Sequence, residues 1–250
     1  MISKAEARRI YRRTLDQVDH LDHSGAAMAL KLLADLKDHI ELEFSRSDWE
    51  AYRAGQLLTA VHKATDDFRD RYWGELRGWQ KSAFELGFSI PQAFDAGISW
   101  AGIWRQGFEA YAHNGLHFVT DLSDDLRKAL SREVLLATTG AVTPATAMQF
   151  VRDYLGGGRA AEARAQAIVT TEVGRNFSMA NFLGMQQAQE IVPDLLKMWL
   201  HLGGGKTNRP VHVAMNGETR KMSEPFIFPG GPLQYPQDPD GDPGETINCH

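Results

Sequence analysis

Three side chains near the C-terminal end have the chemistry of metal ligands: His212, Cys249 and His250. Thiolate sulfur and imidazole nitrogen are the donors that Zn²⁺ prefers, and a tetrahedral zinc ion can hold together a small module with a poor core. His201 is the first candidate for a fourth ligand. The spacing fits no standard zinc pattern, so a second interpretation stays open: His212 hydrogen-bonds the backbone across the Asn216-Gly217 turn.

Other catalytic patterns are weak. Cys249 with a nearby histidine has the residue types of a thiol hydrolase, but little scaffold remains at the penultimate residue to orient a nucleophile. The run Gly203 to Thr207 lacks the first glycine of a phosphate-binding loop and leads into Asn-Arg-Pro rather than a helix. The remaining histidines lie among charged residues at helical spacing and are interpreted as structural: His20, His23, His39, His62, His113 and His117. We therefore expect a protein that is not an enzyme.

The C-terminal stretch that carries these ligands is rich in turns. From about residue 194 the chain has Asn-Gly, Pro-Gly and Gly-Gly pairs, which helices exclude and turns require. The segments 197–202 and 220–228 are predicted as strands on either side of the Asn216-Gly217 turn. The Pro/Gly-rich end must be pinned by packing or be disordered; the side chains available for packing are Phe226, Phe228, Leu233 and Tyr235.

The preceding chain has helical periodicity. Apolar spacing predicts two helices between residues 4 and 44 with a break at Gly25. The Ser47 to Glu50 sequence, S-D-W-E, matches a capping box and predicts a helix to about Leu86, with Trp49 and Tyr52 on its inward face.

Later boundaries also have local signals. Pro91 is placed as the first-turn residue of an aromatic-rich helix, and Asp121 as the N-cap of a short helix that ends at Gly140. Thr143-Pro144 predicts the start of a helix that ends at Gly156.

The alanine-rich segment 159–190 is a strong helix former. Thr171, Glu172, Arg175 and Asn176 within it have two interpretations: part of a close helix–helix contact, or polar groups that face a partner. Small residues follow one stripe and favour close packing: Ala163, Ala167, Thr171, Gly174 and Ser178.

Composition limits the partners. The chain of 250 residues has a net charge of -5 and gives no overall electrostatic reason to bind nucleic acid or an anionic membrane. A local basic patch stays open, at Arg8, Arg9, Arg12 and Arg13. No apolar run approaches the roughly 20 residues of a membrane span, the start has no apolar signal region, and the single cysteine rules out an internal disulfide. We expect no membrane contact and synthesis in the cytoplasm.

These patterns predict a mainly α protein of the α+β class. An elongated or bundled helical body precedes a small, turn-rich C-terminal cap that contains β structure. The predicted domains are an N-terminal helical region over residues 1–150 and a second domain over residues 151–250, in which a long helix leads to the cap from about residue 194.

The C-terminal hundred residues resemble the phage Mu F-like minor head protein family, also known as phage head morphogenesis proteins. The family ending combines a tryptophan-bearing strand, an Arg followed by a His, an Asn-Gly or Asp-Gly turn, Pro-Phe, Tyr-Pro-x-Asp-Pro and a final Glu-x-Ile-Asn-Cys. The alanine-rich helix, with its Thr-Glu and a later Asn, is also similar. The matching residues are Trp199, Arg209, His212, Asn216-Gly217, Pro225-Phe226, 235–239 and 245–249. Two departures stand out: a glycine run replaces the acidic residue after the tryptophan, and Cys249-His250 stands where the family often has Cys-Arg-Cys.

This resemblance implies a structural role in a tailed phage. Such a minor capsid protein is expected in several copies inside the head at the portal vertex, after assembly in the host cytoplasm. It would bind the portal protein, with the major capsid or scaffold protein and packaged DNA as further candidate partners, and would aid assembly, genome packaging or DNA ejection. The alternative is a metal-dependent hydrolase or toxin-associated module that uses the C-terminal His/Cys cluster, with zinc as the cofactor.

Overall fold

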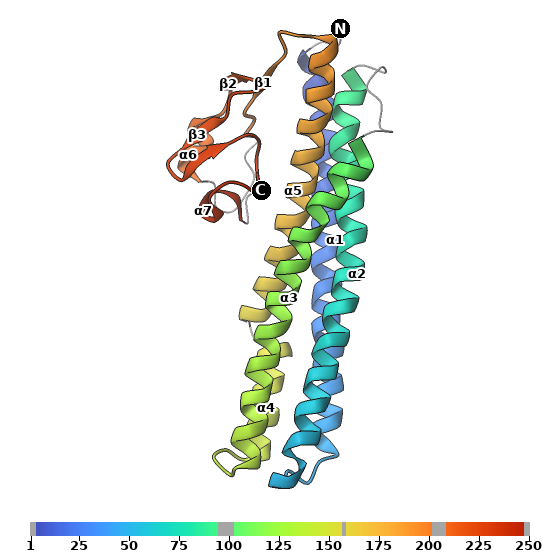
Figure 1. Ribbon diagram of the computed structural model, residues 1–250, viewed down its shortest axis with the longest axis vertical. Coiled ribbons are helices and arrows are strands. Elements are labelled where there is room, and N and C mark those ends of the chain that lie inside the picture. Colours follow the sequence, from blue (N-terminus) through green and yellow to red (C-terminus); the bar gives the residue numbers. More distant parts are fainter. Residues whose placement is uncertain (1–3, 95–102, 157–158, 202–208, 248–250) are drawn as a thin grey trace. The chain divides into compact units, whose positions relative to one another are not determined.

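The computed structural model describes residues 4–94, 103–156, 159–201 and 209–247 (Figure 1). The chain forms two compact units, each assembled from separate stretches of sequence. Unit 1 contains Met1–Asp22, Trp79–Ala112 and Thr170–His250, and unit 2 contains His23–Gly78 and His113–Val169. The domain boundary near residue 150 stays a prediction.

Long helices dominate the described chain. Apolar residues at steps of three and four line their inward faces, and the buried side chains of these faces form the core. The helices are α1 (Lys4–Ser45), α2 (Ala54–Phe94), α3 (Ile103–Thr138), α4 (Pro144–Gly156) and α5 (Arg159–Ile191), with a short 3₁₀ helix at Ala51–Arg53. The prediction of a mainly α fold is confirmed. None of the described helices combines the length and apolar character that a membrane crossing needs.

Three predicted boundaries are wrong because tertiary packing carries the helix through them. Gly25 is buried inside the continuous α1, where packing outweighs the roughly 1 kcal/mol helix penalty of glycine. Pro91 lies in α2 rather than at the start of a new helix, and its ring packs so close to α5 that a Cβ on Gly184 would lie 2.6 Å from its Cγ. Asp121 lies within α3 instead of capping a helix.

The Ser47 to Glu50 segment is a loop, so the capping-box prediction is also wrong. The Ser47 hydroxyl accepts a hydrogen bond from the Trp49 amide at 3.2 Å, and Trp49 adopts a positive φ of 58°. The Trp49 indole donates to the carbonyl of Phe44 at 3.2 Å and packs edge-on against its ring. Tyr52, expected inward, is 70% exposed. These residues end α1 rather than begin α2.

Local signals predict the next boundary correctly. Gly140 has a φ of 80°, the left-handed conformation that suits a residue just after a helix. The Thr143 hydroxyl accepts a hydrogen bond from the Thr146 amide at 3.1 Å, and Pro144 is the first residue of α4. The Thr143 hydroxyl pairs with a backbone N–H that the start of α4 would otherwise leave unpaired, and Pro144 has no N–H that needs a partner.

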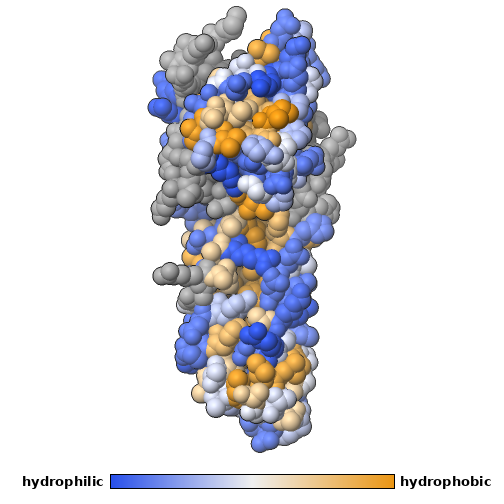
Figure 2. Space-filling model, turned by 90° about the vertical axis from the view of Figure 1, so that its left-hand side faces the viewer, coloured by the Kyte–Doolittle hydropathy of each residue, from blue (hydrophilic) through white to orange (hydrophobic). Residues whose placement is uncertain are grey.

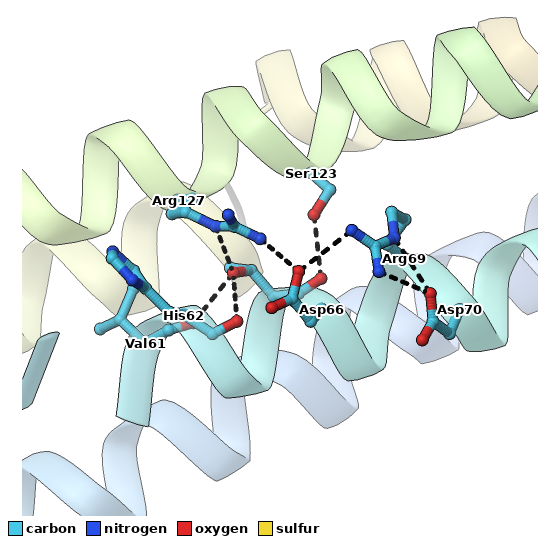
Figure 3. Close-up of polar contacts among 8 residues, drawn as sticks. Val61, His62, Asp66, Arg69, Asp70, Ser123 and Arg127 are labelled. Atoms are coloured by element: carbon cyan, nitrogen blue, oxygen red, sulfur yellow. Dashed lines mark hydrogen bonds and ion pairs between the residues drawn. The ribbon is translucent and has the colours of Figure 1, made fainter. Parts of the chain in front are cut away.

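Unit 2 is tied together by polar contacts between its helices. The Ser123 hydroxyl of α3 donates to the Thr65 carbonyl of α2 at 2.9 Å, and Arg127 donates to the Thr65 hydroxyl at 3.2 Å and pairs with Asp66 (Figure 3). The buried Tyr72 hydroxyl donates to the carbonyl of Ala165 on α5 at 2.6 Å. These bonds satisfy buried polar groups between apolar layers.

In unit 1, α2 and α5 approach closely. A Cβ added to Gly87 would lie only 2.0 Å from the carbonyl oxygen of Phe177, so a side chain at this position would collide with the α5 backbone. Phe84 of α2 meets Phe108 of α3 edge-on at 6.2 Å between ring centroids, and Tyr11 of α1 meets Phe177 at 6.3 Å. Glycine at residue 87 therefore sets the distance between α2 and α5.

Residues 194–201 and 209–247 form a small C-terminal module (Figure 1). Its elements are β1 (Leu196–Met198), α6 (Pro210–Ala214), β2 (Thr219–Lys221), β3 (Phe226–Phe228), β4 (Gly231–Leu233) and α7 (Pro243–Thr246). β1 pairs with β2, and β3 with β4, both antiparallel. The predicted cap with β structure is confirmed, but the single strand predicted over 220–228 is divided by a turn after Lys221.

Candidate functional site

An aromatic cluster forms the core of the C-terminal module. Trp199 follows β1 and lies 5.3 Å from Phe226 and 4.8 Å from Phe228, measured between ring centroids. Alternation on β3 turns both phenylalanines inward and leaves Ile227 exposed. Leu233 completes the buried cluster. The sequence left two possibilities for the Pro/Gly-rich segment, packing or disorder, and the structure shows packing.

His212 on α6 lies against this cluster. Its residue surface is 4% exposed, and its ring lies 5.6 Å from Trp199 and 4.9 Å from Phe228. Nε2 is 2.9 Å from Oε2 of Glu245 on α7. A carboxylate that meets an imidazole nitrogen fixes the orientation of the ring.

Backbone contacts hold α7 and its carboxylate in place. The Asp242 side chain caps α7 by accepting a hydrogen bond from the Gly244 amide at 2.7 Å. Arg209, next to the start of α6, donates to the carbonyl of Ile247 at 2.8 Å. Arg209 and His212 therefore both contact the segment 245–247.

The Asn216-Gly217 pair forms the predicted turn. Gly217 has a φ of 88°, which favours glycine, and its amide donates to the carbonyl of Trp199 at 2.8 Å. The Asn216 side-chain oxygen accepts from the His201 amide at 3.0 Å. The turn is thus fixed to the segment after β1, and the described partner of the His212 Nε2 atom is Glu245 rather than this turn.

The predicted metal ligands are only partly within the described structure. His212 is buried beside Glu245, and His201 is half-buried. Cys249 and His250 lie outside the described residues. Over the described ranges, no three His, Cys, Asp or Glu side chains gather in a way that could hold a metal ion. Glu245 was known from the sequence only as a motif residue, because nothing local links it to His212.

Lys197 is a second unusual polar group of the module. It points inward from β1, and its ammonium nitrogen lies 5.0 Å from the ring centroid of Phe182 and 5.4 Å from that of Phe226. The nitrogen donates to the backbone carbonyl of Gln234 at 3.0 Å and to its side-chain oxygen at 2.5 Å. Burial lowers the pKa of Lys197 to about 8, although the negative charges of Asp238 and Glu224 oppose this change.

The loop after β4 fits against α5. Tyr235 packs on Phe182, with ring centroids 5.0 Å apart. The buried Gln237 has a φ of 60°, and its side-chain oxygen would lie 2.1 Å from a Cβ on Gly174. The small-residue stripe of α5 was expected to allow a close approach by another helix. At Gly174 the group that approaches is the Gln237 side chain.

A buried polar group joins α2 to α5 within unit 1. The Glu172 carboxylate accepts hydrogen bonds from Gln80 at 2.8 Å and Arg175 at 2.7 Å, and the Asn176 side-chain nitrogen donates to the Glu172 backbone carbonyl. Burial raises the pKa of Glu172, while Arg175 and Gln80 oppose the rise. Because these side chains are buried, the interpretation that they face a partner is wrong.

Comparison with protein-family models gives no match, and neither the curated proteins nor the solved structures include a match to this chain. The site is therefore interpreted from its own geometry. It is the polar and aromatic interior of a small module in a mainly α protein.

Proposed function

We propose that this chain is a minor capsid protein of a tailed phage, which binds the portal vertex inside the head and aids assembly, genome packaging or DNA delivery. One observation supports the proposal: the residues through which the sequence resembles Mu F-like head proteins lie together in one module. Trp199 and Phe226 pack in its core, and His212 pairs with Glu245. Buried side chains of this kind stabilise the fold of the module.

Exposed apolar side chains give the module the surface of a protein-binding element. Leu196 and Met198 are each 53% exposed on β1, and Ile227 is 63% exposed on β3. Figure 2 shows hydrophobic residues interrupting the hydrophilic surface on one face of the molecule. Apolar surface that is rimmed by polar residues is typical of protein-interaction sites.

Co-expression with the portal protein of the same phage tests the proposal. We expect the full chain to co-purify with the portal on an affinity tag and to co-elute in size-exclusion chromatography. Ile227→Asp should reduce the retained fraction, since a charge on the exposed face opposes its burial. Leu135→Asp, at a residue of α3 that is 48% exposed, is the control outside the module and should bind normally. A chain that remains monomeric and free of portal would refute the proposal.

The metal hypothesis is the second candidate and uses the same module. Metal-binding histidines commonly direct one ring nitrogen at a carboxylate, as His212 does toward Glu245. The ligands would be His212, Cys249 and His250, with His201 as the fourth. Elemental analysis should then find about one zinc ion per chain in the purified wild-type protein and much less in His212→Ala. Wild-type protein that folds without any bound metal would exclude zinc and, with it, the metal-dependent hydrolase.

A further inference from the structure

The amine of Lys197 and the carboxamide of Gln234 are held in direct contact. They are 37 residues apart in the sequence, yet Nζ lies 2.5 Å from Oε1 of Gln234 and 3.0 Å from its backbone oxygen. The second bond anchors the amine beside this particular residue. Rotation of the terminal carboxamide about its last side-chain bond would present the face of its carbonyl carbon to the same nitrogen.

The surroundings favour reaction of these two groups. Phe182 and Phe226 border the amine, and Lys197 is 4% exposed. Because its pKa is about 8, roughly one Lys197 side chain in ten is neutral and nucleophilic at pH 7. The buried carboxylate of Asp238 holds the Gln234 backbone by accepting a hydrogen bond from its N–H at 2.8 Å, while its negative charge opposes the lowering of the Lys197 pKa.

We propose that Lys197 and Gln234 join spontaneously in an intramolecular isopeptide bond. Such a bond would link β1 to the loop that follows β4. It is a covalent modification independent of the proposed capsid role.

The reaction balances without any further reagent. The neutral amine attacks the carbonyl carbon of the Gln234 side chain, and a bond forms between Nζ and Cδ. A proton passes from the attacking nitrogen to the carboxamide nitrogen. The bond from Cδ to Nε2 then breaks, and ammonia leaves. Fixed contact between the reactants replaces a bimolecular encounter, and loss of the buried positive charge removes its desolvation cost.

Intact-mass spectrometry of the purified full chain tests the proposal. We expect a mass lower by about 17 Da, the mass of the released ammonia. Protease digestion should then yield a branched peptide that contains both Lys197 and Gln234. Because Asn216-Gly217 can lose ammonia by forming a succinimide, fragmentation of that peptide must place the loss at the Lys197 to Gln234 link. An unchanged mass, or a loss located elsewhere, would overturn the proposal.

Variants supply the matched controls. Lys197→Arg keeps the positive charge but removes the nucleophilic amine, so its mass should equal that calculated from its sequence. Gln234→Met removes the carbonyl carbon that the amine would attack, so its mass should also equal the value calculated from its sequence. A loss of about 17 Da that persists in both variants would place the reaction at other residues and overturn the proposal.

Discussion

Glu245 Oε2 lies 2.9 Å from His212 Nε2, although the two residues are 33 positions apart in the chain. This contact fixes α7 against α6, beside a ring cluster that also contains Trp199. The arrangement gives the histidine a structural role whether or not a metal is bound. Loss of the His212 side chain should therefore destabilise the module, whether or not the residue also binds a metal.

Replacement of His212 by alanine should destabilise the C-terminal module. The change removes a buried ring between Trp199 and Phe228 and leaves Glu245 without this partner, for a cost of about 2–4 kcal/mol. Urea unfolding measures the total, and faster amide hydrogen exchange within residues 196–233 should locate the effect.

His62→Ala is the control for this prediction. His62 is exposed on α2, so its replacement should change the free energy of unfolding by less than about 0.5 kcal/mol. Equal effects of the two variants would contradict a special structural role for His212.

The sequence predicts the fold class and the boundaries that depend on local chemistry. Gly140 and Thr143 end and begin helices as expected, because a left-handed conformation and a capping hydroxyl act within a few residues. Gly25 and Asp121 do not interrupt their helices, because buried faces on neighbouring residues contribute more than the local signal costs. Those contributions depend on partners distant in the chain.

The candidate site shows the same limit. His212 is identifiable from its residue type, whereas its partner Glu245 becomes apparent only when α6 and α7 are placed together. In the sequence Lys197 looks like an ordinary strand residue. Its unusual environment arises only in the folded chain, where Phe182 on α5 and Gln234 after β4 enclose it. Pairings over such sequence separations have no periodicity or turn signal from which they could be predicted.

Gly87→Ala should destabilise unit 1. The new methyl group would lie 2.0 Å from the carbonyl oxygen of Phe177, so α2 and α5 would have to separate at a cost of about 1–3 kcal/mol. Gly74→Ala on the same helix is the control. No atom lies within 4 Å of its added Cβ, so the higher helix propensity of alanine should stabilise the protein by about 0.5–1 kcal/mol. Thermal unfolding of both variants checks the opposite signs.

The raised pKa of Glu172 predicts a pH-dependent stability. The folded state holds this proton more tightly than the unfolded state, so the contribution is complete below the ordinary value of 4.5 and is lost as pH rises through the folded pKa. Wild type should therefore lose stability relative to Glu172→Gln as pH increases from about 4 to 7. Urea unfolding of both proteins across this range measures the difference; a difference that is constant or grows with pH would contradict the prediction.

A double-mutant cycle should reveal coupling between Gly174 on α5 and Gln237 in the loop after β4. Gly174→Val places atoms where the buried Gln237 side chain lies, with the first of them 2.1 Å from its oxygen. Gln237→Ala removes that obstacle, so Gly174→Val should cost about 1–2 kcal/mol less in the Gln237→Ala background than in wild type. The cycle cancels the lower helix propensity of valine, because both backgrounds contain it. Urea unfolding of the four proteins gives the coupling, and costs that add within about 0.5 kcal/mol would mean that the loop does not pack into the Gly174 notch.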